Sequence, residues 1–121
     1  MRKPFATWTV GETDYKLKLT TSDVASLEEK FNTNLLNIIM GNGLPALSIM
    51  LQITHAAMKK YQHGIKLDAV YDLFDTYLDE GGSQTDFMTD VFIPIYQASG
   101  FLSDKMGEEM ENSLEKAKEN M

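Results

Sequence analysis

The sequence predicts a mainly α-helical fold in one compact domain, residues 1–121, with an N-terminal β-hairpin followed by about six short-to-medium helices. The first twenty residues alternate with the two-residue period of strands, and from Thr21 onward the period becomes helical. Short turns separate the helical segments, with no linker and no internal repeat. With 43% hydrophobic residues the chain can bury a core, but 121 residues leave little room for a second domain.

The hairpin is expected over residues 1–20. The β-prone run at residues 5–10 is followed by turn material and then by a strand in which Tyr15, Leu17 and Leu19 alternate with lysines. We expect the three apolar side chains to face a core and the lysines to face water. Because an isolated hairpin is only marginally stable, its apolar face has to lie on the helices that follow or on a partner.

A helical core is expected over residues 21–102. It begins with the start signal Thr21–Asp23. Asn32 is expected to end this first helix in a left-handed conformation, and Thr33 to cap the short apolar helix Leu35–Met40.

The next helix is expected to be the central one, because it is apolar over more than one stripe. Pro45 suits its first turn, and it should run to about Gln62. Asp68 is expected to cap the following helix, and Ser83 to open another in which Pro94 predicts a kink. The helix after Asp68 is expected to turn five residues inward: Val70, Leu73, Phe74, Tyr77 and Leu78.

The stretch Tyr71–Asp86, YDLFDTYLDEGGSQTD, gathers carboxylates around a Gly-Gly pair without any Lys or Arg. An EF-hand calcium loop needs oxygen ligands at positions 1, 3 and 5, glycine at 6 and glutamate at 12. A loop starting at Asp75 has Tyr77 at position 3, and one starting at Asp79 has Gln84 at position 6. Neither register fits, so a calcium loop of this type is excluded.

A helical wheel accounts for these acids better. Asp72, Asp75 and Asp79 lie opposite the apolar face of their helix. Catalytic carboxylate pairs need unlike environments, which a single solvated stripe does not provide. Asp79 and Glu80 also lie at the helix C-terminus, where negative charge is disfavoured. Either solvent screening or a basic partner would offset that cost, so the four acids are candidate partner-binding residues.

No catalytic, cofactor-binding or metal-binding residue is predicted. His55 and His63 are eight residues apart, whereas metal-binding histidine pairs on helices prefer a spacing of four. The glycines at 41–43 and 81–82 match neither the Walker nor the dinucleotide-binding pattern. The chain has no cysteine. We therefore expect a protein that is not an enzyme.

The last helix, expected over residues 103–121, is acidic and carries an apolar edge. Met106, Met110 and Leu114 recur on it at four-residue steps. Most of the eight methionines are expected to fill the core, but methionine-rich faces also occur where a surface accepts partner segments. These three residues are therefore candidates for a groove, or for a helix that docks on another chain. The segment from Glu108 onward is expected to be the least firmly held.

The net charge of −7 is concentrated in residues 65–121, where thirteen acidic and four cationic side chains give −9. Nucleic acid is therefore not expected as a partner, because phosphate binding needs a concentrated basic face. The acidic half favours a basic protein surface, or simply keeps the protein soluble. No apolar run is long enough to span a membrane, and the N-terminus lacks the apolar core of a signal peptide, so a cytoplasmic protein is expected.

Six segments, spread in order over nearly the whole chain, resemble the tail assembly chaperones of long-tailed bacteriophages and of prophages of Gram-positive bacteria. They are KPFATWTV at 3–10, YKLKLTT at 15–21, LEEKFNTNLLNI at 27–38, HAAMKKYQHGIKL at 55–67, YDLFDTYLDEGGSQTDF at 71–87 and FIPIYQASGF at 92–101.

The resemblance implies a small, mainly helical, non-enzymatic protein in the cytoplasm of the bacterial host. Such chaperones bind the long, helical tape measure protein, help to recruit tail tube protein around it, and are absent from the mature virion. Many are made in two lengths, the longer through a ribosomal frameshift, and this chain resembles the shorter product. The sequence leaves a homo-oligomeric state open.

Two other functional classes fit the same residues. One is a structural tail or connector subunit that stays in the virion, and the other is a generic acidic helical adaptor domain. A small metal- or ligand-binding enzyme is a third class, for which the residues offer no site.

Overall fold

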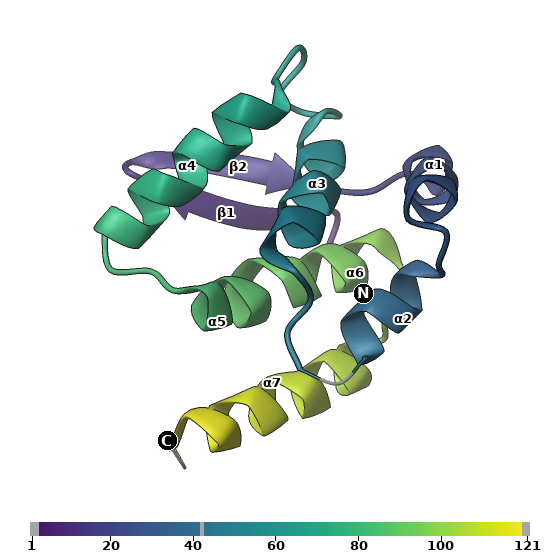
Figure 1. Cartoon of the computed structure of the whole chain (residues 1–121), viewed down its shortest axis with the longest axis vertical. Coiled ribbons are helices and arrows are strands. Elements are labelled where there is room, and N and C mark those ends of the chain that lie inside the picture. Colours follow the sequence, from purple (N-terminus) through teal and green to yellow (C-terminus); the bar gives the residue numbers. More distant parts are fainter. Residues whose placement is uncertain (1–2, 42, 120–121) are drawn as a thin grey trace.

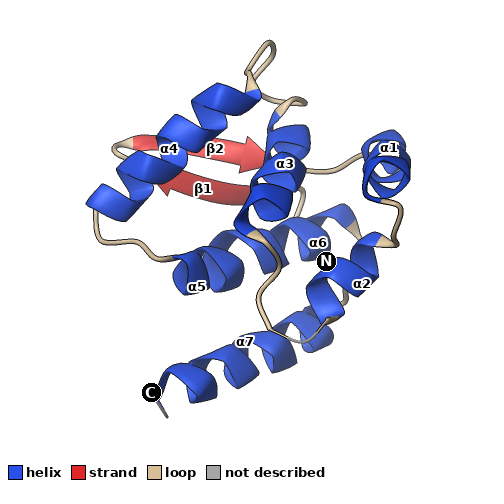
Figure 2. Cartoon of the chain, in the orientation of Figure 1, coloured by secondary structure: helices blue, strands red, loops and turns tan. Residues whose placement is uncertain are grey.

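The computed structural model describes residues 3–41 and 43–119, with the side chains of residues 117–119 left out of the description. It has an N-terminal antiparallel hairpin followed by helices, in one compact domain (Figures 1 and 2). Three helical segments follow one another without a break over residues 84–99 and form one helix, so the described chain contains six helices as expected. The elements are β1 Ala6–Val10, β2 Thr13–Leu17, α1 Thr21–Phe31, α2 Leu35–Met40, α3 Leu47–Met58, α4 Leu67–Asp79, α5 Gln84–Phe87, the π-helix η1 Met88–Phe92, α6 Ile93–Ser99 and α7 Asp104–Glu119.

The hairpin packs on the helices through one face. Ala6 pairs with Leu17 and Val10 with Thr13, so the turn between the strands has two residues. Gly11 takes φ +63°, which suits the first central position of a type II′ turn. The apolar side chains on the inner face are buried, and Tyr15 is half-buried. The hairpin and its orientation are therefore as predicted.

The caps of α1 explain its limits. The Thr20 hydroxyl accepts from the Asp23 amide at 3.1 Å, while the Asp23 carboxylate accepts from the Thr20 amide at 3.0 Å. This reciprocal capping box satisfies amides that the first turn leaves without helical partners. At the other end Asn32 is left-handed, with φ +53°. The prediction that Asn32 ends this helix is confirmed.

The prediction that Thr33 caps α2 is wrong. The Thr33 amide donates to the Glu28 carbonyl at 3.2 Å and so completes the end of α1. Asn34 is the cap instead, because its side-chain oxygen accepts from the Leu36 amide at 2.8 Å. The Glu28 carboxylate also accepts from the Leu35 amide at 2.9 Å, which ties α2 to α1.

Helix α3 is the central helix, with seven of its twelve residues buried. It begins at Leu47, so Pro45 lies before its first turn rather than in it. It ends at Met58, four residues short of the predicted Gln62. The chain turns back there, and Nε2 of His55 lies 2.8 Å from the Ile65 carbonyl, which joins α3 to the segment before α4.

Helix α4 buries a narrower face than predicted. Val70 and Phe74 are buried and Leu73 and Tyr77 half-buried, but Leu78 is 42% exposed. Leu78 lies at the edge of the apolar arc, one residue before the last residue of the helix.

The expected start of α4 is also wrong. Lys66 occupies the cap position without a side-chain hydrogen bond, and Asp68 lies in the first turn. An acid there still favours the helix, because its charge faces the positive end of the helix dipole.

An aromatic cluster joins the hairpin to α4 and α5. Trp8 is nearly fully buried, and its ring centroid lies 5.1 Å from that of Phe87 and 6.0 Å from that of Tyr77. Phe74 stacks edge-on against Phe87 at 5.3 Å. Burial in this cluster, reinforced by the charges of Asp90 and Asp86, raises the pKa of Tyr77 to about 12.

The segment in which Pro94 predicts a kink contains the π-helix η1, directly before the proline. Pro94 lacks an amide proton and cannot bond to the carbonyl of Asp90. In the turn before it, the Ile93 amide donates to the Met88 carbonyl, five residues back. A single π-turn of this kind absorbs the defect without ending the helix. Ser83 caps the start of this long segment, as predicted, since its hydroxyl accepts a 3.1 Å hydrogen bond from the Asp86 amide.

In the part of the chain that the structure describes, no helix is both long and apolar enough to cross a membrane.

Candidate functional site

Helix α7 lies at one end of the molecule, away from the hairpin turn and α4 (Figure 1). Ser103 caps it through a 3.2 Å bond from the Met106 amide. Gly107 is buried against α6, and a Cβ added there would lie 2.5 Å from Cδ of Gln97. The helix therefore rests on the core at a glycine contact, with Met110 and Leu114 partly buried beyond it.

A groove runs between α7 and α2. Its volume is about 390 Å³. Its floor includes Met88, at the start of η1, which is only 4% exposed, while Met40 and Met106 on the two sides are 53% and 38% exposed. We call it the methionine groove, and its described lining is Ile39, Met40, Gly41, Gly43, Met88, Met106, Glu109, Met110, Ser113 and Leu114.

The structure brings together the three apolar residues that the sequence singled out on the last helix. Met106, Met110 and Leu114 all line the methionine groove. The opposite wall, with Ile39 and Met40, was missed. Those residues belong to a short, nearly all-apolar segment that fits core filling equally well. Only the folded chain shows that they line the same groove as residues of α7.

The four acidic candidates do not form one site. Asp72, Asp75 and Asp79 are exposed along α4, as the helical wheel predicts. Glu80 has a partner within the chain, since its carboxylate accepts from the Gly11 amide at 2.8 Å. It holds the hairpin turn against the end of α4.

The acidic residues of α4 and the methionine groove lie on separate parts of the molecule. Figure 1 places α4 beside the hairpin and α7 at the opposite end. A single short segment of a partner therefore does not cover both.

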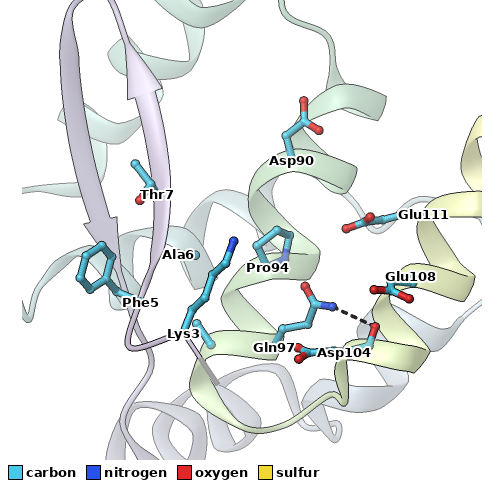
Figure 3. Close-up of a pocket in the computed structure, with 11 residues that line it drawn as sticks. Lys3, Phe5, Ala6, Thr7, Asp90, Pro94, Gln97, Asp104, Glu108 and Glu111 are labelled. Atoms are coloured by element: carbon cyan, nitrogen blue, oxygen red, sulfur yellow. Dashed lines mark hydrogen bonds between the residues drawn. The ribbon is translucent and has the colours of Figure 1, made fainter. Parts of the chain in front are cut away.

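An acidic hollow lies on the other side of α7, toward α6 and β1. Its volume is about 510 Å³. Figure 3 shows Glu108 and Glu111 of α7 facing the helix that carries Asp90 and Pro94, with Lys3 reaching in from the hairpin. No pattern in the sequence predicts this hollow, because its acids come from two helices at unrelated spacings.

Burial raises the pKa of Glu111 in this hollow above its ordinary value of 4.5, and the nearby carboxylates of Asp90, Glu108 and Glu115 raise it further. The carboxylates of Asp90 on η1 and of Glu108 and Glu111 on α7 therefore repel one another when ionised. Such a hollow suits a cationic group, but among the described residues no set of three histidine or acidic side chains is placed to hold a metal ion.

Comparisons with known proteins give the family of the chain. Neither curated proteins nor solved structures gave a match. One family model covers residues 1–120, that of DUF6096, which is described as a family of unknown function. Because this match spans almost the whole sequence, the chain belongs to the DUF6096 family.

Proposed function

We propose that this protein is a non-enzymatic tail assembly chaperone of a phage or prophage, which binds the tape measure protein and helps to recruit tail tube protein around it. The observation that carries the proposal is the methionine groove. Three residues selected for partner binding from the sequence alone, Met106, Met110 and Leu114, line one wall of it. The segments that resemble this class of chaperone give the partner.

The groove supports this role through its chemistry. Four of its described lining residues are methionines, and the flexible, polarizable thioether side chain adapts to differently shaped apolar partners. A chaperone for a long helical protein has to accept many similar segments, which such a surface permits. Apolar helix edges bind in grooves through side chains spaced by three or four residues.

The acidic half of the chain supports the same role. A net charge of −9 over residues 65–121 repels nucleic acid and favours a basic protein partner. A chaperone of this kind acts in the host cytoplasm and leaves before the virion is complete.

The proposal is tested by co-expression with the tape measure protein of the same phage or prophage. We expect the tape measure protein to become soluble and to co-purify with this chain. Met106→Glu places a charge in the groove at a position that is already exposed, so it should abolish the effect while leaving the fold intact.

Leu78→Glu is the matched control, because Leu78 is similarly exposed, 42% against 38% for Met106, but lies on α4. It should solubilise the tape measure protein as well as the native sequence does. If co-expression with the native chain leaves the tape measure protein insoluble, the proposed function is wrong.

A structural tail or connector subunit makes a different prediction. Such a subunit stays in the particle, whereas a chaperone is lost. Mass spectrometry of purified virions that finds this chain in stoichiometric amounts would favour the structural subunit.

A further inference from the structure

The two walls of the methionine groove differ in charge. On the α2 side, residues 31–44 contain no charged side chain. On the α7 side, Glu109 is exposed and lines the groove. Glu109 is the charged residue among the described lining of the groove, so the groove is apolar with an acidic rim on one side.

The size of the groove limits what can enter it. About 390 Å³ accommodates a few large side chains rather than a whole helix. The groove is open, since Met40 and Met106 stand exposed on either side of it. A partner helix would therefore lie over the groove and insert the side chains of one edge, as helices do at positions i, i+3 or i+4, and i+7.

From these observations we infer that the methionine groove binds an amphipathic helix in one orientation. The apolar edge of the partner inserts between α2 and α7, and a Lys or Arg next to that edge faces Glu109. The opposite flank of the partner, over the uncharged α2 wall, needs no charge. This inference rests on the proposed function, since it assigns the groove to the helical segments of the tape measure protein.

The charge pair supplies orientation more than affinity. An exposed ion pair adds little binding energy, but a like charge at the same place is unfavourable. A partner helix that is rotated or reversed loses the pair while keeping the apolar contact. Glu109 therefore selects one of the orientations that the apolar groove alone would accept.

The inference is tested with two synthetic helical peptides that share one leucine-lined edge. One carries Lys on the flank of that edge and the other carries Glu at the same positions. Fluorescence anisotropy of the labelled peptides, titrated with the full chain at low salt, should show that the Lys peptide binds more tightly by about threefold. The preference should disappear at about 1 M salt, where the Debye length falls to about 3 Å.

Reversing the charge of the rim should reverse the preference. Glu109→Lys is expected to bind the Glu peptide more tightly than the Lys peptide. Glu12→Lys makes the same change of charge in the exposed hairpin turn and should leave the preference as it is. Met106→Glu should weaken the binding of both peptides, and circular dichroism checks that each variant is folded.

Each outcome decides one part of the inference. If Glu109→Lys leaves the preference unchanged, the assigned orientation is wrong. If Met106→Glu binds both peptides normally, the groove is not the binding surface. Analytical ultracentrifugation that shows a dimer, broken by Met106→Glu, would mean that a second copy of the chain occupies the groove, and would overturn the inference.

Failure here is distinct from failure of the proposed function. If neither peptide binds but co-expression still solubilises the tape measure protein, the groove inference is wrong and the chaperone function stands. If the peptides bind as expected but the tape measure protein stays insoluble, the groove binds helices of another protein.

Discussion

Tyr96 on α6 is bonded to Leu35 on α2, 61 positions away in the sequence. Its hydroxyl donates to the Leu35 carbonyl at 2.8 Å, and both groups are buried. Burial raises the pKa of the Tyr96 hydroxyl well above its usual range, and the negative charge of Glu28 adds a smaller increase. The hydroxyl therefore keeps its proton, and remains a donor, at neutral pH. This one bond fixes α2, and with it one wall of the methionine groove, against α6.

Tyr96→Phe is expected to lower the free energy of unfolding by about 1–2 kcal/mol, because the buried Leu35 carbonyl loses its donor while the ring is kept. Urea denaturation followed by circular dichroism measures the change. Tyr71→Phe removes a hydroxyl from an exposed tyrosine and should have almost no effect. Equal losses in the two variants would contradict this role of Tyr96.

Single residues also show what the sequence can and cannot predict. Asn32 was predicted as a left-handed stop because the signal is local and lies in the residue itself. Glu80 was predicted to be open to a partner, but it bonds to Gly11, 69 residues away. Helical periodicity places an acid on the outer face without revealing which distant amide meets it there.

At the scale of the elements, periodicity predicted the order of the hairpin and helices correctly, and the boundaries less well. The predicted end of α3 was wrong by four residues. The Tyr61 and Gln62 amides both donate to the Met58 carbonyl, so the chain leaves the helix axis in a turn directly after Met58, although the residues there have no helix-breaking glycine before Gly64. Leu78 was assigned to the core by its helical angle, but its side chain is 42% exposed. The type and order of the helices and strands can be predicted from local sequence patterns. Which of their faces are exposed depends on packing between segments that are distant in the sequence.

The junction between α4 and α5 depends on a close contact at Gly82. A Cβ added to Gly82 would lie 2.5 Å from two ring atoms of Tyr77. This ring is held edge-on against Trp8 and Phe87, so it cannot move without disturbing the aromatic cluster.

Gly82→Ala is therefore expected to destabilise the fold by about 1–3 kcal/mol, as overpacking of a core does. Thermal unfolding followed by circular dichroism measures the loss. Gly107→Ala is the comparison, because its added Cβ would meet the end of the flexible Gln97 side chain, and alanine favours a helix. A loss for Gly107→Ala as large as that for Gly82→Ala would contradict the special role of the Tyr77 contact.

At the scale of the whole molecule, α7 separates two unlike surfaces. The methionine groove lies on one side of it and the acidic hollow on the other. The same helix therefore carries the residues proposed to bind a partner and the carboxylates that repel Asp90 of η1 across the hollow. How firmly α7 is held determines how well the groove is formed.

The raised pKa of Glu111 gives this balance a pH dependence. Since the folded chain holds the Glu111 proton more tightly than the unfolded chain, the contribution of this group to stability is greatest below about pH 4.5 and is lost as the pH rises through the raised pKa. Hydrogen exchange of the α7 amides, expressed as protection factors to remove the intrinsic pH effect, should show protection declining over this window.

Glu111→Gln should flatten the decline and raise protection at pH 7, because an uncharged amide no longer repels Asp90 and Glu108. Glu29→Gln, an exposed change on α1, should leave the profile of α7 as in the native chain. A decline of the same size in Glu111→Gln would mean that other groups control the docking of α7.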